Sequence, residues 1–199
     1  MVKPIIENDD KIPLELDPLE IYHGIIKAEE SKTGEVSILP YDVPREEASK
    51  SEKVQEIFTA RLEELKTKTE TFLEGIENGL DTLPYGIRYV AHLMYQDLRA
   101  KFSSESEDHI TKVIGNLIYY RYMNPAIVAP EGFDVITSLM SAESRKTLAE
   151  ISRVLQVITS FSQFKNEYEY LKPLNEWVAQ CSNRFKKYLL KCKQPYVYI

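Results

Sequence analysis

Residues 45–78 contain no proline, and their apolar side chains recur at the three- and four-residue spacing of an α-helix. The expected inner stripe of this segment consists of Val54, Ile57, Phe58, Leu65, Thr69, Phe72, Leu73 and Ile76. Gly79 follows directly and is expected to end the helix. A helix well above about 25 residues is expected either to project as an arm between two lobes or to contain a kink. Because the chain has seven glycines among 199 residues and is dominated by helix formers, we predict an all-α fold with no significant sheet.

Helix signals also flank this long segment. Asp17 is a capping residue, Pro18 suits a first helical turn, and Gly34 is expected to end the helix that follows, near residue 31. The other expected helices cover residues 3–8, a stretch that opens near Leu83 and Pro84, residues 107–123, residues 142–159 after a cap at Ser141, and residues 169–191 with a kink or first-turn position at Pro173. In the helix after Pro84 the expected buried residues are Ile87, Val90, Ala91, Met94 and Leu98.

Charge is unevenly distributed along the chain. Residues 1–80 carry 19 acidic and 10 basic side chains and residues 81–199 carry 12 and 15, so the two parts hold charges of −9 and +3 within the net −6. We interpret the acidic part as a solvated helix face. The basic residues of the second part leave open a modest role in steering an acidic partner or the cytoplasmic membrane surface. No nucleic-acid partner is expected, because the basic tract is short within an acidic chain. The tract consists of Arg184, Lys186, Lys187, Lys191 and Lys193.

Candidate metal-binding and redox residues are few. Cys181 and Cys192 share a helix face at a distance of three turns, which rules out a local disulfide, and two thiols do not make a zinc site. We expect both to be buried and reduced, as in the cytoplasm. His23, His92 and His109 are scattered without metal-ligand spacing. No cofactor, metal or catalytic group is therefore expected, and neither a signal peptide nor a membrane span is visible.

Residues 116–130 place one cation where a helix is expected to be apolar. At 100° per residue, Arg121 returns to within about 20° of Ile110, so its side chain is expected to point inward. A buried guanidinium needs carbonyls or a carboxylate to satisfy its five donors. Such an arginine either fixes neighbouring loops for structural reasons alone or fixes loops that form part of a binding site. Asn124 and Pro125 are expected to stop the helix, and Pro130 to fix a second bend.

This stretch resembles the signature of the Ras GTPase-activating domain, in which Phe-Leu-Arg-Phe is followed by a hydrophobic residue, Asn-Pro-Ala and a further proline. Here the signature reads Tyr-Tyr-Arg-Tyr-Met-Asn-Pro-Ala over residues 119–126, with Pro130 after it. The form of the match is similar to the IQGAP branch of that family and extends over nearly the whole chain. The supporting motifs are Asp-Pro at 17–18, Lys-Thr-Gly-Glu at 32–35, Leu-Pro-Tyr-Asp-Val at 39–43, Leu-Pro-Tyr-Gly-Ile-Arg at 83–88, Ile-Gly-Asn-Leu at 114–117 and Pro-Tyr-Val-Tyr-Ile at 195–199.

The resemblance implies a partial, multi-helix Ras-GAP-like domain. It assigns residues 1–192 to the C-terminal portion of that domain, with extra-lobe-like helices over 1–82 and the signature core over 83–192, and residues 193–199 to the following segment. The structural signature residues are Arg121, Asn124, Pro125, Ala126 and Pro130, with Arg121 as the family arginine that braces the finger loop. The arginine finger itself lies upstream of this chain in the family. Residues 148–156 are similar to the helix that contacts the GTPase, which makes Ser152, Arg153 and Gln156 the candidate GTPase-binding residues.

By this resemblance the chain is a non-catalytic module that binds a GTP-loaded Rho-family GTPase, with Ras-family GTPases as the alternative. The IQGAP branch implies a scaffold that also engages actin and calmodulin-like light chains and regulates the actin cytoskeleton or cytokinesis. Its expected location is the cytoplasm, at the cytoskeleton or cell cortex, or at the contractile ring in a fungus. Two other interpretations remain: a genuine Ras GTPase activator, and a structural helical spacer.

Overall fold

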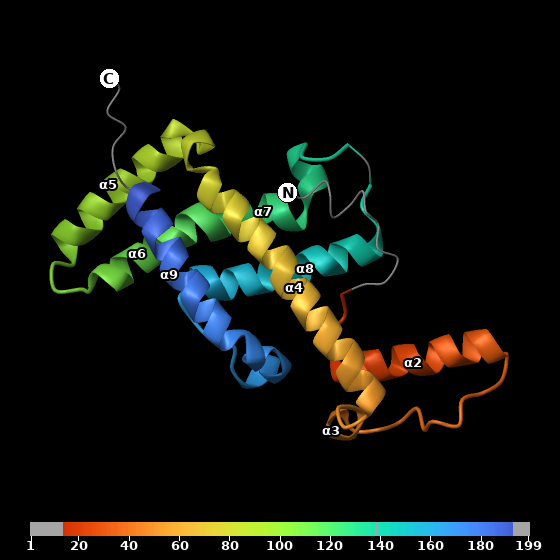
Figure 1. The fold of residues 1–199 in the computed structure, drawn as a ribbon. Helices are drawn as coiled ribbons and strands as arrows, with labels where there is room; N and C mark the ends of the chain where they lie inside the picture. Colours follow the sequence, from red (N-terminus) through yellow and green to blue (C-terminus); the bar gives the residue numbers. More distant parts are fainter. Residues whose placement is uncertain (1–13, 138, 193–199) are drawn as a thin grey trace.

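The computed structural model describes residues 14–137 and 139–192, and every regular element assigned in these ranges is a helix (Figure 1). The α-helices are α2 (Pro18–Thr33), α3 (Arg45–Ala48), α4 (Glu52–Asn78), α5 (Tyr85–Lys101), α6 (Glu107–Gly115), α7 (Asn124–Val128), α8 (Ala142–Thr159) and α9 (Asn175–Cys192). A π-helical segment, η2 (Asn116–Met123), and three 3₁₀ segments, η1 (Leu80–Thr82), η3 (Pro130–Phe133) and η4 (Asn166–Leu174), connect them. The prediction of an all-α fold is confirmed. The expected helix at residues 3–8 lies outside the described residues.

Local sequence signals set the ends of α2 and α8. The Asp17 carboxylate accepts a hydrogen bond from the Leu19 amide at 3.0 Å, and Pro18 occupies the first turn of α2. Gly34 ends α2 with φ = 75°, a left-handed conformation that suits a residue without a Cβ. The Ser141 hydroxyl accepts from the Ser144 amide at 3.0 Å and so caps α8. Both helices therefore lie where they were predicted.

The long predicted helix is interrupted near its start. Residues 49–51 separate the single turn of α3 from α4, and Ser51 has an extended conformation with ψ = 124°. The Gln55 side-chain amide donates to the Ser49 carbonyl at 3.1 Å, which satisfies a backbone group at the break. A kink, one of the two outcomes expected for a helix of this length, is thus present close to residue 50. The break lets Ala48 and Val54 both pack in a small apolar cluster beside α2.

The core consists of two apolar clusters, and α4 contributes to both. Near its N-terminal end α4 packs against α2, whereas its later turns pack against α8 and α9 (Figure 1). Phe72, Leu73 and Leu65 of α4 are fully buried in the larger cluster together with the inner faces of α6, α8 and α9. Burial of such side chains stabilises each by roughly 1.5–3 kcal/mol. The long helix is therefore the element that joins the small α2 cluster to the main core.

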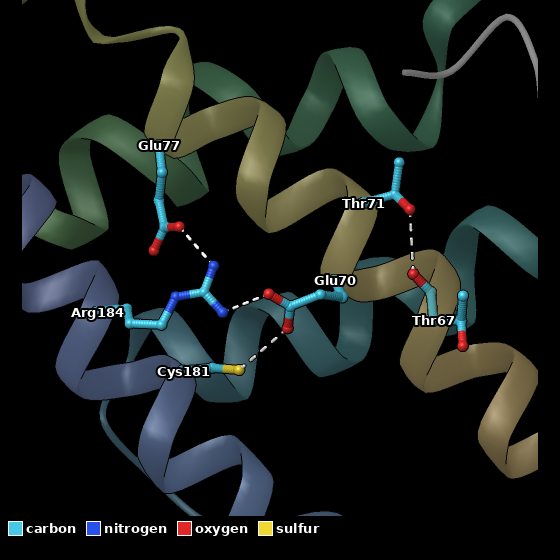
Figure 2. Close-up of polar contacts among 6 residues, drawn as sticks. All are labelled: Thr67, Glu70, Thr71, Glu77, Cys181 and Arg184. Carbon is cyan, nitrogen blue, oxygen red and sulfur yellow. Dashed lines mark hydrogen bonds and ion pairs between the residues drawn. The ribbon is translucent and has the colours of Figure 1, made fainter.

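Polar contacts add to the apolar packing where α9 crosses α4 (Figure 2). The Arg184 guanidinium donates to Glu70 and, at 2.6 Å, to Glu77, which lie two turns apart on α4. The Cys181 thiol lies 3.7 Å from the second oxygen of Glu70 and donates to it. The hydrogen bonds to both carboxylates raise the pKa of Arg184. Because Arg184 is more than a third exposed, solvent screens these pairs, and they orient the helices more than they stabilise them.

Both cysteines are free and buried, which confirms the prediction for this pair. Burial raises the pKa of Cys181 to about 12 and that of Cys192 to about 11. At pH 8 the thiolate fraction of each is therefore two to three orders of magnitude below that of an ordinary thiol.

We expect alkylation of the native protein by iodoacetamide to be slow. The native labelling rate should keep rising about tenfold per pH unit through pH 10, since both thiols stay protonated there. The labelling rate of the protein in denaturant should instead level off near pH 9. Mass spectrometry of quenched samples measures both rates. Equal native and denatured rates at pH 8 would contradict the burial of the two thiols.

The prediction for α5 is wrong in part. Ala91 is buried, but Val90 is 47% exposed, and the buried residues of this helix are Ala91 and Arg88. The reason is that α5 packs on α6 and α9 along one side and lies at the edge of the molecule (Figure 1). Its other side presents Tyr85 and Tyr89, whose rings stack with centroids 5.7 Å apart. Apolar periodicity alone did not show which of the two apolar sides faces the core.

Candidate functional site

The signature residues 119–126 lie on a helix that changes its type twice. The α-helical turns of α6 pass at Asn116 into the π-helical segment η2, and α7 continues from Asn124 to Val128. Buried residues along α6 and η2 recur every four positions, as Ile110, Ile114 and Ile118 and as Thr111, Gly115 and Tyr119. The first step of each series lies in α6, where a four-residue step is ordinary for an α-helix, and the second step enters the wider turns of η2.

The inward direction expected for Arg121 is wrong. Its side chain is exposed, and its guanidinium carbon lies 5.5 Å from the centroid of the Tyr120 ring. Through the wide turns Arg121 follows Val113 and Leu117 at four-residue steps, and both of these lie half-buried at the edge of the core. The three side chains line a shallow groove of about 400 Å³. The 100° rotation used for the prediction does not hold across a π-helical segment.

A buried arginine does lie close to the signature, on the preceding helix. Arg88 of α5 is 9% exposed, three residues before the fully buried Ala91. Its positive charge acts on Tyr188 and Cys192 of α9, where burial is the main cause of the raised pKa and Arg88 opposes it. The sequence signal that could have identified Arg88 as buried was its three-residue spacing from Ala91, since residues three apart share a helix face.

Asn124 and Pro125 do not stop the helix, contrary to the prediction. Asn124 has helical angles, φ = −58° and ψ = −41°, and Pro125 lies in the first turn of α7. A proline in a helix lacks an N–H and clashes with a carbonyl one turn earlier. The π-helical turn directly before it widens the helix at that carbonyl, so the chain passes through. The second bend was predicted correctly, because Pro130 is buried and opens η3 after α7 ends.

Asn124 forms the polar connection between α7 and α8. Its side-chain oxygen accepts hydrogen bonds from the Ser152 hydroxyl at 2.6 Å and from the Tyr119 hydroxyl at 3.1 Å. The Tyr119 hydroxyl also lies 3.3 Å from the Ser152 carbonyl. Tyr119 is fully buried, and this burial raises its pKa well above the usual value, so the hydroxyl remains a donor. The predicted signature residue Asn124 and the predicted contact residue Ser152 are thus in direct contact.

The three candidate contact residues all line one groove of about 450 Å³ beside this network. Ser152, Arg153 and Gln156 of α8 line it together with Val128 of α7 and Tyr168 of η4. Ser152 is buried and committed to Asn124, whereas Gln156 is exposed. Arg153 lies between these extremes, with 29% of its side chain exposed. Arg153 and Gln156 are therefore the groove residues with polar atoms open to a partner.

Arg153 is held by two neighbours. Its Nη1 donates to the Glu150 carboxylate one turn earlier, and its guanidinium carbon lies 4.7 Å from the centroid of the Tyr168 ring. Burial lowers the pKa of Arg153, but the hydrogen bond and the charge of Glu150 outweigh it and leave the pKa raised. Burial raises the pKa of Glu150, and Arg153 opposes that rise. Arg153 therefore keeps its positive charge at the groove at any physiological pH.

The larger groove between α2 and α4, of about 760 Å³, is lined by apolar side chains and by charges of both signs. Within residues 14–137 and 139–192, no group of three histidine, cysteine or carboxylate side chains is placed to hold a metal ion. No helix in the same ranges combines the length and the apolar character needed to cross a membrane.

Comparison with known families identifies the class of protein. The family model described as GTPase-activator protein for Ras-like GTPase matches residues 1–160, which include α2 to α8, the signature and the groove residues Ser152, Arg153 and Gln156. The chain therefore belongs to the family of Ras GTPase-activator domains. The all-α architecture and the signature of residues 119–126 agree with this assignment.

Individual relatives place the chain in the IQGAP branch, as its motifs predicted. Ras GTPase-activating-like protein IQGAP2 from Homo sapiens is 38% identical over 200 residues, which cover 98% of this chain and 13% of the relative. Ras GTPase-activating-like protein rgaA from Dictyostelium discoideum is 37% identical over 95% of this chain and 23% of its own length. Ras GTPase-activating-like protein rng2 from Schizosaccharomyces pombe is 23% identical over 89% of this chain and 12% of its own length. The chain thus spans less than a quarter of the length of each of these relatives.

Proposed function

We propose that this chain binds a small GTPase of the Rho family in its GTP state and supplies no active site of its own. The proposal rests on the groove lined by Val128 of α7 and by residues of α8, because this groove places Arg153 and Gln156 beside the family signature. A charged guanidinium and an exposed amide offer hydrogen-bond donors to an acidic or carbonyl-rich surface. The partly buried hydrogen bond between Asn124 and Ser152 supports the wall that presents them.

Arg121 has a separate part in this proposal. By resemblance to the family, it braces a finger loop that residues outside this chain contribute. Its exposed position supports that role, since the guanidinium borders the groove of Met94, Val113 and Leu117 and is open to backbone carbonyls of another segment. Residues 1–192 would then act as the C-terminal portion of one GTPase-activator domain, divided near residue 82.

The wider setting is also part of the proposal. An IQGAP-type scaffold would bring actin and calmodulin-like light chains to the same molecule in the cytoplasm, at the cell cortex or at a contractile ring. A second candidate function, activation of GTP hydrolysis by a Ras-type GTPase, is favoured by the names of the relatives and of the family model. Single-turnover hydrolysis with the complete domain separates the two, since a binder slows the loss of GTP and an activator speeds it.

The binding test uses the 199-residue chain and a Rho-family GTPase loaded either with a non-hydrolysable GTP analogue or with GDP. We expect binding to the GTP-analogue form alone. Replacing the pair as Glu150→Gln with Arg153→Met should weaken that binding about tenfold, as expected for the loss of one charge-assisted contact. The double substitution avoids leaving the Glu150 carboxylate without its cation. Isothermal titration calorimetry measures the affinities.

Arg145→Met is the matched control, because Arg145 lies on the same helix, is half-exposed and is paired with Glu131 away from the groove. It should bind the GTPase as the unmodified chain does. Equal affinity for the GTP-analogue and GDP forms, or equal losses from the groove and control variants, would contradict the proposed function. Failure to bind either form would favour the helical spacer.

A further inference from the structure

Tyr168 is a groove residue that the sequence did not predict. It lies fifteen positions after Arg153 on a different element, η4, and its ring faces the Arg153 guanidinium at 4.7 Å. Cation–π contacts act within about 6 Å of the ring centroid, so this pair is well inside the range. The contact approaches Arg153 from outside α8, whereas Glu150 holds it from within the helix.

The backbone and a neighbouring ring fix the position of Tyr168. Its backbone angles, φ = −124° and ψ = 52°, depart from the helix around it, and its amide donates to the Lys165 carbonyl at 3.0 Å. Its ring packs edge-on against Tyr170, with centroids 6.3 Å apart at an interplanar angle of 78°. The Tyr168 ring is also half-buried against the main apolar cluster. A ring held in these ways is a fixed surface for the cation.

The two contacts leave part of the guanidinium available. Nη1 donates to Glu150, while a guanidinium carries five N–H donors in one plane. Stacking on an aromatic face covers that plane and leaves its edge for hydrogen bonds. A long arginine side chain otherwise loses rotamer freedom when a partner fixes it. Contacts that order Arg153 before the partner arrives lower that cost.

We propose that Tyr168 is a positioning residue for the GTPase contact, which holds Arg153 in the conformation that the partner binds. The inference rests on the function proposed above for the groove. The ring is the functional part of Tyr168, and its hydroxyl is not required. Glu150 holds the same guanidinium by accepting a hydrogen bond from its Nη1.

The first experiment tests the contact in the free protein. In the NMR spectrum, the Arg153 side-chain protons should show a ring-current shift from Tyr168 in the unmodified chain. Tyr168→Phe should retain that shift, and Tyr168→Leu should abolish it. Melting temperatures of the two variants report whether the chain has remained folded. An unshifted Arg153 in the unmodified chain would overturn the proposal without reference to any GTPase.

The second experiment tests the consequence for binding, with the GTP-analogue form of a Rho-family GTPase as the probe. Tyr168→Leu should weaken binding about two- to fivefold at an unchanged melting temperature, and Tyr168→Phe should not weaken it. In the Glu150→Gln, Arg153→Met background, Tyr168→Leu should have no further effect. If that background weakens binding while Tyr168→Leu does not, the positioning role is wrong and the groove function stands. If no groove variant alters binding, the proposed function fails as well.

Discussion

Phe185→Ala is expected to lower the free energy of unfolding by about 3–5 kcal/mol, as large apolar truncations in a packed core do. Phe185 of α9 is fully buried, and its ring packs at 84° against Tyr119 with centroids 6.4 Å apart. Its ring also stacks on Tyr188 at 5.5 Å. Since single domains are stable by roughly 5–15 kcal/mol, the loss is a large fraction of the total. Urea denaturation followed by circular dichroism measures it.

Phe133→Ala is the matched control, because Phe133 lies in η3 with 53% of its surface exposed. It should cost less than about 1 kcal/mol. The core substitution also tests a link to the groove, since Tyr119 connects Phe185 to Asn124 and Ser152. Hydrogen exchange should therefore accelerate in α7 more than in α2. A Phe185→Ala protein as stable as the Phe133→Ala protein would contradict this account of the core.

Sequence reasoning succeeded where a single residue decides local structure. The ends of α2 follow from Asp17, Pro18 and Gly34, and the start of α8 follows from the Ser141 cap, because these signals act through their own backbone neighbours. Leu148, Ile151, Leu155 and Ile158 recur at helical spacing along α8, and all four are fully buried. One face of α8 contacts the core, so the spacing of its apolar residues predicts a single set of buried residues.

Local structure was not predictable from the sequence where packing against distant residues determines it. No proline or glycine marks the break at residues 49–51, which exists because Ala48 and Val54 both reach the small cluster on α2. In α5 the side with Val90 and the side with Ala91 are both apolar, and contact with α9 selects the second. A choice between two apolar faces depends on which neighbours are present, and helical periodicity does not carry that information.

In the candidate site, too, some features were predictable from the sequence and others were not. The sequence predicted that Ser152, Arg153 and Gln156 belong together, and their spacing on α8 brings them to one groove. The exposed position of Arg121 was missed because a π-helical segment changes the rotation per residue between Ile110 and Arg121. Tyr168 was missed because its proximity to Arg153 depends on how η4 folds back on α8. Neither feature has a signature in residue spacing.

Gly115→Val is expected to destabilise the protein by about 3 kcal/mol, at the upper end of the range for overpacked cores. A Cβ at Gly115 would lie 2.8 Å from the Leu189 Cδ1, 3.4 Å from the Thr159 carbonyl oxygen and 3.8 Å from the Phe185 Cε1. The tip of Leu189 can shift, but the Thr159 carbonyl belongs to the last turn of α8 and is fixed. Valine adds two further carbons to this Cβ and therefore needs more room than alanine does. Thermal unfolding measured by calorimetry gives the loss.

A double-substitution cycle with Leu189→Ala identifies the cause. Leu189→Ala alone should cost about 2–5 kcal/mol through the cavity it leaves, and valine at position 115 should fill part of that cavity. The double variant should therefore be more stable than the sum of the two single losses predicts, by about 1–3 kcal/mol. Gly24→Val in α2 is the control, because a Cβ there would meet no atom within 4 Å beyond its chain neighbours and its own helix backbone. A favourable coupling would show that close packing of α6 on α9 excludes a side chain at position 115, whereas strictly additive losses would contradict this account, since Gly115 has ordinary helical angles, φ = −59° and ψ = −36°.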